Sequence, residues 1–272
     1  MRVSVVTGGG GGMGLACAQQ LAARGDGLVL NEIDSSRSKH AVETLRARGA
    51  SVESVDGDVS HADVARALAA AASEMGAFGA LVHTAGLSPT MADGRRILEV
   101  NLVGTELLLD AFQPLATAGS VAVCIASQAG HFGMTGATPE ICALLDEPLA
   151  RDLADRLEAA GVTLDPGTGY AMSKLGVIRA AVRLAPAWGA RGARIVSLSP
   201  GIIETKMGTQ EYEAQPVMAT MVERTPLGRM GAAAEIASVV EFLCSDAASF
   251  ITGTDLLVDG GSTGAMRALM PS

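Results

Sequence analysis

Several residue types are scarce in this chain, and each scarcity argues against a class of protein. Aromatic residues make up 3% and charged residues 18% of the 272 residues, whereas hydrophobic residues reach 49%, which is typical of a folded domain. Basic residues number 20 against 29 acidic ones, the net charge is −9, and no Lys/Arg cluster offsets it locally. We therefore expect no nucleic-acid partner. No apolar run approaches the roughly 18 residues that a membrane-spanning helix needs, so we expect no membrane partner either.

Cysteine is also scarce, with four residues that lie far apart in the chain: Cys17, Cys124, Cys142 and Cys244. They form no CxxC motif and no His/Cys spacing typical of a metal site, so we expect no metal ion. Residues 3–6 lead directly into a glycine cluster, which leaves no room for a signal peptide. Scattered thiols without a leader indicate a cytoplasmic protein whose cysteines are reduced.

Short apolar runs alternate with longer segments of helical spacing. The runs predict strands at 3–7, 27–32, 51–56, 80–84, 120–126, 194–199 and 255–258. Helical patterns cover 13–24, 36–48, 62–74, 95–115, 168–188 and 233–244. Continuous apolar strands that alternate with helices predict an α/β fold, a Rossmann-type doubly wound parallel sheet of about seven strands. No linker or repeat divides the chain, so we expect one Rossmann domain over residues 1–272.

One segment, at about 132–167, is not required by this alternation. Positions 140–145 and 148–160 have the spacing of two short amphipathic helices. Because the segment follows the carboxyl end of a strand, we expect this helical insertion beside the ligand crevice. A lid, a pocket wall and an oligomer contact are all open roles for it.

The first predicted strand runs into a glycine cluster and then directly into a helix. Glycines let the backbone approach a pyrophosphate, and the helix N-terminus offers free N–H groups. The strand–glycine–helix order predicts a dinucleotide site, with phosphate-binding residues Gly8, Gly12, Met13 and Gly14. Glu32, at the end of the second strand, suits hydrogen bonds to the ribose hydroxyls.

The same residues favour NAD over NADP. A carboxylate at Glu32 repels a 2′-phosphate, and neither Gly11 nor Ile33 supplies a cation to hold one. Arg37 is the nearby cation whose side chain is able to reach back to a 2′-phosphate.

The ends of the third and fourth strands are expected to complete the cofactor site. Asp58 and Val59 suit the adenine, although Asp58 is equally well read as a turn or cap residue. The small residues Ala85 and Gly86 let a cofactor lie close to the sheet. His83 precedes them and is better explained as a structural histidine than as a catalytic one.

Tyr170 and Lys174 stand four residues apart on a predicted helix, so both side chains can point into one site. A positive charge near a phenol favours the phenolate and lowers its pKa from about 10, which makes Tyr170 a usable general acid or base. Taken alone, such a pair is more often an exposed Tyr and Lys. Ser127, taken alone, is more often a turn or cap residue after the fifth strand.

In combination, the loop Thr7-Gly8-x-x-x-Gly12-x-Gly14, Ser127 and Tyr170-x-x-x-Lys174 resemble the short-chain dehydrogenase/reductase family over essentially the whole chain. Supporting marks are Asn101 within Glu99-Val100-Asn101-Leu102-Val103-Gly104, the turn Pro200-Gly201-x-x-x-Thr205, and the ending Val258-Asp259-Gly260-Gly261. The long stretch between Ser127 and Tyr170 is similar to the branch that contains bacterial 3α-hydroxysteroid dehydrogenase/carbonyl reductase. His83-Thr84 departs from the two asparagines usual at that place.

This resemblance implies an NAD-dependent oxidoreductase that moves a hydride between nicotinamide and a secondary alcohol or ketone. By resemblance, Tyr170 exchanges the proton, Lys174 lowers its pKa and holds the ribose, and Ser127 orients the substrate oxygen. Asn101 anchors a water linked to Lys174. The turn residues Pro200, Gly201, Ile203 and Thr205 fix the nicotinamide. The resemblance also implies a homo-oligomer, either a dimer or a tetramer.

Two other classes compete with this reading: a catalytically silent NAD-binding regulator, and an isomerase or dehydratase that uses bound NAD. The substrate pocket is expected to draw on the insertion, the loop at 202–216 and the segment after Ala85. Candidate apolar lining residues are Met91, Phe132, Met134, Met207, Tyr212, Met218 and Met221. Flexible methionines suit a bulky apolar alcohol such as a steroid, although Met is as often core filling. Gln128 and His131 follow Ser127 closely and either line the pocket or support it.

Overall fold

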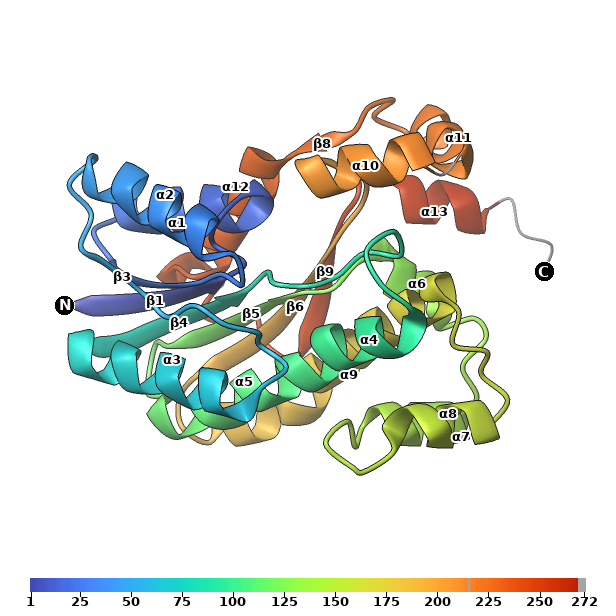
Figure 1. Cartoon of the computed structure of the whole chain (residues 1–272), viewed down its shortest axis with the longest axis horizontal. Helices are drawn as coiled ribbons and strands as arrows, with labels where there is room; N and C mark the ends of the chain where they lie inside the picture. The colour runs from blue at the N-terminus through green and yellow to red at the C-terminus, as the bar shows by residue number, and fades with distance from the viewer. Residues whose placement is uncertain (215, 269–272) are drawn as a thin grey trace.

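The computed structural model describes residues 1–214 and 216–268, so position 215 and positions 269–272 of the predicted domain lie outside the described part (Figure 1). Within it, seven strands form one parallel sheet in the order β3-β2-β1-β4-β5-β6-β9. Their bounds are β1 (Arg2–Thr7), β2 (Gly27–Asn31), β3 (Val52–Ser54), β4 (Ala77–His83), β5 (Val121–Ile125), β6 (Arg194–Pro200) and β9 (Thr254–Val258). The sheet confirms the predicted Rossmann-type fold, and all seven predicted strands are present with small shifts at their ends.

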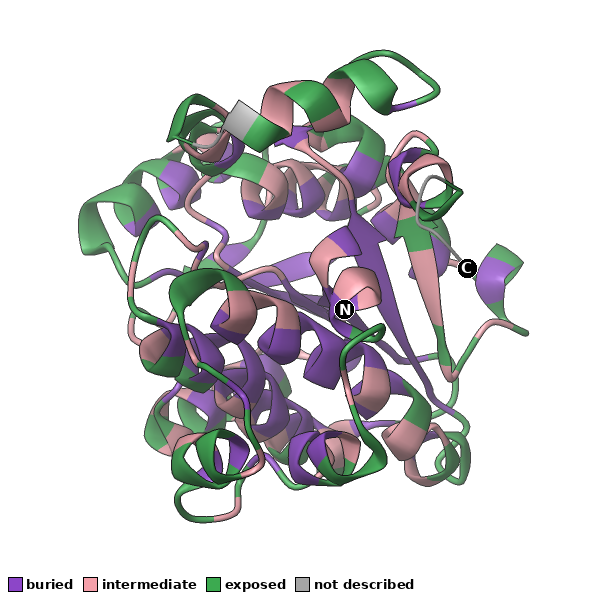
Figure 2. Cartoon of the chain, turned by 90° about the vertical axis from the view of Figure 1, so that its right-hand side faces the viewer, coloured by how far each residue is buried: buried purple, intermediate pink, exposed green. Residues whose placement is uncertain are grey.

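Helices cover both faces of this sheet. On one face lie α1 (Gly12–Ala23), α2 (Ser35–Arg46) and α12 (Ala233–Leu243), and on the other lie α3 (Ala62–Met75), α5 (Gly104–Phe112) and α9 (Pro166–Gly189) (Figure 1). Successive strand residues point to opposite faces, so Val6 packs under α1 and α12 whereas Val5 packs on the α3 side. Figure 2 shows the consequence, a buried sheet between helices whose outer faces are exposed.

The predicted helix at 95–115 is divided into four pieces. These are α4 (Gly94–Leu98), the π-helical turn η1 (Glu99–Val103), α5, and the 3₁₀ turn η2 (Gln113–Leu115). Asn101 lies in the π-helical turn, which is a kind of distortion found frequently at functional sites.

The short helix α6 (Gln128–Gly133) leads into the insertion, which contains α7 (Pro139–Leu145) and α8 (Leu153–Ala159). The helices α7 and α8 pack on the outer side of α9 and α4 (Figure 1). Arg179 of α9 pairs with Asp146, and Arg95 of α4 pairs with Asp155 and Glu158 of α8. The two predicted amphipathic helices are therefore present, and their polar sides bind neighbouring helices.

The segment predicted as a loop at 202–216 is largely helical, which corrects the expectation. After the short strand β7 (Ile203–Glu204) come α10 (Lys206–Ala214), α11 (Pro216–Arg224), the short strand β8 (Gly231–Ala232) and, past β9, α13 (Ser262–Arg267). The Thr205 hydroxyl accepts a hydrogen bond from the Gly208 N–H at 3.0 Å, which supplies one of the groups that a helix N-terminus needs. Among the described residues, no helix is long and apolar enough to cross a membrane.

Candidate active site

A cavity of about 640 Å³ opens at the carboxyl edge of the sheet. It brings together predicted site residues from six loops and helices: Gly8, Gly12, Met13, Gly14, Glu32, Asp58, Val59, Ala85, Gly86, Tyr170, Lys174 and Thr205. Ser127, Asn101, Pro200, Gly201 and Ile203 lie outside its lining. Of the predicted apolar lining residues, Met91 and Met207 line the cavity. No residue of the insertion helices α7 and α8 does so, because these helices pack behind α4 and α9.

The glycine loop forms a cradle at one end of this cavity. Gly12 has a φ of +53°, a conformation that side chains disfavour, and a Cβ on Gly14 would collide with the Gly8 carbonyl oxygen. A Cβ on Gly11 would meet no atom within 4 Å, so the loop is open towards the cavity. The helix α1 begins at Gly12 and presents its free N–H groups to this space, which fits a pyrophosphate.

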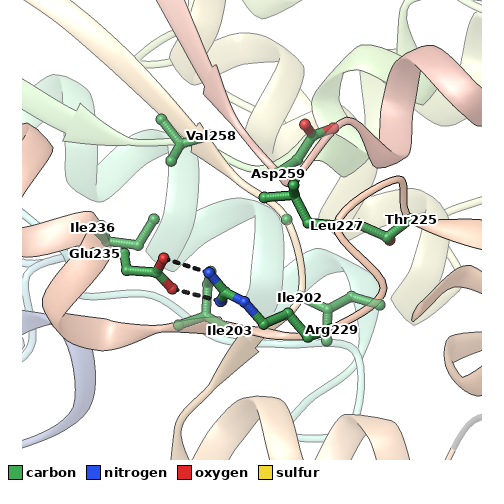
Figure 3. Close-up of a pocket in the computed structure, with 12 residues that line it drawn as sticks. Ile202, Ile203, Thr225, Leu227, Arg229, Glu235, Ile236, Val258 and Asp259 are labelled. Carbon is green, nitrogen blue, oxygen red and sulfur yellow. Dashed lines mark hydrogen bonds and ion pairs between the residues drawn. The ribbon is translucent and has the colours of Figure 1, made fainter. Parts of the chain in front are cut away.

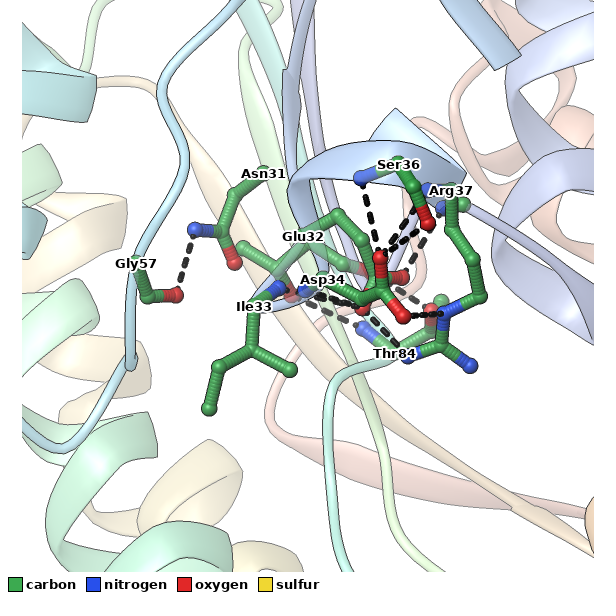
Figure 4. A network of polar contacts seen from close by, with 10 residues as sticks. Asn31, Glu32, Ile33, Asp34, Ser36, Arg37, Gly57 and Thr84 are labelled. Atoms are coloured by element: carbon green, nitrogen blue, oxygen red, sulfur yellow. Dashed lines mark hydrogen bonds and ion pairs between the residues drawn. The ribbon is translucent and has the colours of Figure 1, made fainter. Parts of the chain in front are cut away.

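Glu32 lies beside this cradle, and its carboxylate is hydrogen-bonded within the chain (Figure 4). Its side chain accepts hydrogen bonds from the Gly10 N–H at 3.2 Å and from the Ile33 N–H at 3.0 Å. The Arg37 guanidinium donates to Glu32 Oε1 at 2.5 Å, so this cation does reach back along α2. Glu32 is therefore a buried, paired carboxylate, and Arg37 also lines the cavity.

Asp58 is likewise paired, with a cation that the sequence did not reveal. The Arg96 guanidinium of α4 binds the Asp58 carboxylate, and the Ser60 hydroxyl and N–H donate to Asp58 Oδ1 at 2.7 and 2.9 Å. Burial opposes the charge of Asp58, but these hydrogen bonds and Arg96 outweigh it and lower the Asp58 pKa. Asp58 is thus a turn residue, which is one of the two alternatives from the sequence. Asp58 and Arg96 also both line the cavity.

The end of β4 is fixed to the end of β1 by side chains. Thr7 Oγ1 accepts from the N–H groups of Thr84 and Ala85, both at 3.2 Å, and lies 2.7 Å from His83 Nδ1. Burial lowers the pKa of His83 from 6.5 to about 3, helped by the Lys174 charge, so the ring is neutral at neutral pH. His83 is buried behind the cavity and supports its wall, as a structural histidine would.

Tyr170 and Lys174 line the other end of the cavity, and Ser127 lies next to Tyr170. The Ser127 side chain hydrogen-bonds the Tyr170 phenol, and Ser127 also caps α6 by accepting from the Ala129 N–H at 3.1 Å. The Lys174 ammonium is buried, donates to the Ile125 carbonyl oxygen at 2.8 Å, and lies 5.8 Å from the centre of the Tyr170 ring. One turn of α9 thus presents both side chains to the end of β5, as their spacing predicts.

The pKa of Tyr170 shifts in the direction opposite to the one expected. Burial raises it to about 12, the Ser127 hydrogen bond opposes the rise, and the Glu211 carboxylate adds to it. Burial also lowers the pKa of Lys174 to about 8, with Cys124 and Glu211 opposing that change. Without bound cofactor, burial of the phenol therefore raises the Tyr170 pKa more than any effect of the Lys174 charge lowers it. The Lys174 ammonium is held instead by the Ile125 carbonyl oxygen.

Asn101 stands behind Lys174 and is fully hydrogen-bonded by its neighbours. Its Oδ1 accepts from the Leu87 N–H at 2.7 Å, and its Nδ2 donates to the Leu87 carbonyl at 3.0 Å and to Ser173 Oγ at 3.3 Å. A Cβ on Gly86 would lie 3.0 Å from Asn101 Oδ1 and 3.6 Å from Lys174 Nζ. Asn101 thereby fixes the segment after β4 against the lysine.

The turn after β6 lies against the glycine loop, because a Cβ on Gly12 would stand 3.5 Å from the Thr205 methyl group. Gly201 and Ile203 face away from the main cavity into a smaller pocket of about 90 Å³ (Figure 3). There Arg229 and Glu235 form a two-pronged ion pair with both distances at 2.8 Å. Arg229 and Glu235 thus satisfy each other, and Asp259, which also lines this pocket, accepts from the N–H groups of Gly261 and Thr263.

Some lining residues had no signal in the sequence. Arg96 and Lys206 depend on how α4 and α10 are placed, and no local motif marks either one. His131 proves to be a supporting residue, because its Nε2 lies 2.7 Å from Asp255 Oδ2. The Asp255 carboxylate in turn accepts from the hydroxyls of Ser197 and Ser199 on β6.

A parallel doubly wound sheet with a glycine loop at its carboxyl edge defines a nucleotide-binding α/β protein. Comparison with known proteins specifies the class further. The family described as "short chain dehydrogenase" matches residues 2–139, and that described as "Enoyl-(Acyl carrier protein) reductase" matches residues 149–263. The chain belongs to the short-chain dehydrogenase/reductase family, whose members are oxidoreductases that use NAD(P), and it is an enzyme of this type.

Relatives and solved structures agree on the family. The chain is 31% identical to the short-chain dehydrogenase/reductase bsc3 of Alternaria brassicicola, with 93% of each chain covered. It is 30% identical to D-threitol dehydrogenase of Mycolicibacterium smegmatis, covering 96% of this chain and 93% of that one. It is 31% identical to cis-4-hydroxycyclohexanecarboxylate dehydrogenase of Sinomonas cyclohexanicum, with 96% of each covered. A crystal structure described as a glucose/ribitol dehydrogenase from Brucella melitensis has a TM-score of 0.77 at 30% identity, with 96% of each chain covered.

Proposed function

We propose that this chain is an NAD-dependent dehydrogenase that interconverts a secondary alcohol and a ketone. The observation that carries the proposal is the placement of Tyr170 and Lys174 at one end of a cavity whose other end is the glycine cradle, with Ser127 next to the Tyr170 phenol. A phenol, a hydroxyl and an ammonium are the groups needed to handle the proton of an alcohol, and neither a pure binding protein nor a scaffold requires them.

Each side chain has a distinct role in this proposal. Bound NAD supplies the hydride acceptor. Tyr170 takes the proton from the alcohol oxygen, and in the reverse direction returns it to the ketone oxygen. Ser127 Oγ accepts from the Ala129 N–H, and its one hydroxyl proton, which in the chain alone faces the Tyr170 phenol, turns to the substrate oxygen when the substrate binds. Lys174 holds the nicotinamide ribose and keeps a positive charge near the phenol, and Asn101 positions Lys174 through the segment after β4.

The adenine end supports NAD as the preferred cofactor. Glu32 lines the cavity and keeps one oxygen, Oε2, whose only partner is the Gly10 N–H, so this oxygen can accept from a ribose hydroxyl. A 2′-phosphate would meet the Glu32 carboxylate and would need Arg37 to leave it, at a cost in electrostatic energy. Asp58 and Val59 complete the wall on the adenine side.

The names of the relatives support a small secondary alcohol as substrate. They include D-threitol dehydrogenase, galactitol 2-dehydrogenase from Cereibacter sphaeroides and cyclohexanol dehydrogenase from an Acinetobacter strain. Polyols and cyclic alcohols are therefore the two classes that we propose. A steroid remains the bulkiest candidate, since Met91 and Met207 line the cavity.

The deciding experiment measures NADH formation by the purified protein with a panel of polyols, cyclic alcohols and steroids. We expect turnover with members of at least one class, and the Tyr170→Phe variant should remain inactive on the same substrates. Substrate conversion without net NADH formation would support an isomerase or dehydratase instead. Tight NAD binding without any conversion would support a regulatory protein.

We also propose that the chain forms a homo-oligomer. The edge strand β9 and its neighbours expose apolar side chains, with Phe250 fully exposed, Phe242 42% exposed and Leu257 38% exposed. An exposed edge strand with apolar neighbours is suited to bury a second copy. Light scattering coupled to size exclusion tests this, and Phe250→Glu should shift the protein to a smaller species. A monomeric wild type would contradict the proposal.

A cytoplasmic location is proposed on the basis of the cysteines. All four are free, and three of them are buried in the apolar layers, Cys17, Cys124 and Cys244. Such thiols suit a reducing compartment. Cell fractionation with a marker enzyme tests this location.

A further inference from the structure

A largely buried histidine–aspartate pair lies outside the cavity and joins α6 to β9. His131 Nε2 lies 2.7 Å from Asp255 Oδ2, and the two side chains are 14% and 7% exposed. The other oxygen, Asp255 Oδ1, accepts hydrogen bonds from the hydroxyls of Ser197 and Ser199 at 2.6 and 3.0 Å. Both carboxylate oxygens therefore have partners, which fixes the carboxylate on the sheet. Neither His131 nor Asp255 lines the cavity, so the pair has no direct part in the chemistry above.

A buried pair of this kind contributes little to the free energy of folding. Taking two polar side chains out of water costs about as much free energy as their attraction returns, so apolar side chains of similar volume often stabilise a fold as well. The pair differs from apolar packing in its direction, since a hydrogen bond is lost when its two atoms turn or slide apart. The contact between His131 and Asp255 therefore fixes how α6 is rotated against β9 more than it stabilises the fold.

A different side of α6 packs against the turn of α9 that carries Tyr170 and Lys174. A Cβ on Gly130 would lie 2.8 Å from the Lys174 carbonyl carbon, and a Cβ on Gly133 would lie 3.1 Å from the Ala171 carbonyl oxygen. These distances mean that the backbones of the two helices are in contact at this turn, which glycine permits. Helix α6 is thus held between α9 on its glycine side and β9 on its histidine side.

The position of Ser127 depends on α6. The helix begins directly after this residue, and Ser127 Oγ caps it by accepting from the Ala129 N–H at 3.1 Å. The Ser127 side chain also lies next to the Tyr170 phenol. His131 follows Ser127 by about one helical turn. Because α6 is only six residues long, a rotation or slide of the helix at His131 also moves Ser127.

We propose that His131 and Asp255 are positioning residues for Ser127, because they hold α6 at the rotation in which the Ser127 hydroxyl meets the substrate oxygen. Both residues act from outside the cavity and contact neither substrate nor cofactor. The inference rests on the proposed dehydrogenase function and on the role of Ser127 in it. Loss of the pair should lower kcat and leave NAD affinity unchanged, since a misplacement of about 1 Å costs roughly 100-fold in rate.

Two variants at His131 differ in how far their side chains reach. The Nε2 of a glutamine can take the place of the His131 Nε2 and donate to Asp255, whereas an asparagine is one CH2 group shorter and its amide stops short. We expect His131→Asn to lower kcat about 10- to 100-fold with the fastest alcohol of the panel above, and His131→Gln to stay within a few-fold of the wild type. Calorimetric titration should give the same NAD affinity for all three proteins.

A double-mutant cycle separates positioning from a general loosening of the fold. If His131 acts through Ser127, then His131→Asn should change kcat by at most about twofold in a Ser127→Ala background. A merely structural role would give the same fold loss in both backgrounds. Asp146→Asn is the matched control, because Asp146 pairs with Arg179 and so contacts α9 without involving α6. This control should leave kcat within about twofold in both backgrounds.

The outcomes distinguish this inference from the function on which it rests. Equal kcat of folded His131→Asn and His131→Gln, or equal fold losses with and without Ser127, would overturn the positioning role alone. Failure of His131→Asn to fold would also overturn it, since the pair would then be needed for folding itself. Unchanged kcat in Ser127→Ala would overturn the role of Ser127 and this inference with it. Failure of the wild type to form NADH with any alcohol would overturn the proposed function as well.

Discussion

The guanidinium of Arg37 lies 2.5 Å from the carboxylate of Glu32, so this acidic residue of the cavity wall carries its own counter-ion. The Glu32 side chain is 5% exposed and that of Arg37 is 52% exposed, which means that the arginine covers the carboxylate from the solvent side. In the proposed cofactor site, the two side chains favour different groups at the 2′ position of the adenosine ribose. Glu32 favours a hydroxyl, and Arg37, if released, would favour a phosphate.

Removing the charge of Glu32 should therefore change cofactor choice. We expect Glu32→Gln to raise kcat/KM with NADPH about 10- to 100-fold, because Arg37 becomes free to bind the 2′-phosphate. The double variant Glu32→Gln/Arg37→Gln should lose this gain, and initial rates with both cofactors measure it. Equal efficiency of the wild type with NADPH and NADH would refute the assignment of Glu32.

Tyr170→Phe removes the phenolic oxygen and keeps the ring. We expect kcat to fall by about 10²- to 10⁴-fold, the usual contribution of a positioned general acid or base, while NAD affinity stays within a few-fold. Lys174→Met should weaken both turnover and NAD binding, since Lys174 serves the ribose as well. Initial rates together with calorimetric titration of NAD separate the two effects. Normal activity of the Phe variant would mean that the proton is handled elsewhere.

The rate of alcohol oxidation should rise with pH. Oxidation requires the Tyr170 phenolate, and burial raises the pKa of Tyr170 to about 12, so below that pH each unit increases the phenolate fraction roughly tenfold. We expect log kcat/KM to rise with a slope near one up to pH 8. Above it the slope should decrease, because the Lys174 ammonium, whose pKa burial lowers to about 8, loses its charge. A profile that is flat between pH 6 and pH 8 would exclude the phenolate as the base.

His83 should make the fold sensitive to acid. The unfolded chain binds a proton at His83 below about pH 6.5, whereas the native chain does so only below about pH 3, because the ring is buried. The unfolded state thus binds more protons between these values, and the free energy of unfolding falls as pH falls through that window, by a total on the order of a few kcal/mol. The variant His83→Asn keeps a polar partner for Thr7 and has no proton to gain. We expect its acid unfolding midpoint, followed by circular dichroism, to lie at lower pH than that of the wild type. An unchanged or higher midpoint would count against this account.

The parts of the fold that were predicted correctly depend on local pattern. The strands are runs of Val, Leu and Ile, and the helix that carries Tyr170 and Lys174 begins at Asp165-Pro166, a cap followed by a proline suited to the first turn. The glycine loop was equally visible, because its position between strand and helix is itself the signal. The helices after β7 were missed, because each is only nine residues long and Gly208 and Pro216 in this stretch favour a loop.

What the sequence did not reveal depends on residues that are distant along the chain. Arg96 reaches Asp58 from another helix, and nothing near either residue marks the pair. The direction of the Tyr170 pKa was also missed. The spacing to Lys174 was known, but the pKa depends on how completely the surrounding elements remove the phenol from water.

Helix α4 carries two neighbouring arginines that face different parts of the molecule. Arg95 binds Asp155 and Glu158 of the insertion, and Arg96 binds Asp58 at the cavity wall. The insertion is therefore linked through α4 to Asp58 at the cavity wall, although it lines no part of the cavity. We expect the charge reversals Asp155→Lys and Glu158→Lys together to weaken AMP affinity more than they change kcat at saturating NAD. Equal affinity for AMP in the variant and the wild type would show that the ion pairs of Arg95 do not influence AMP binding.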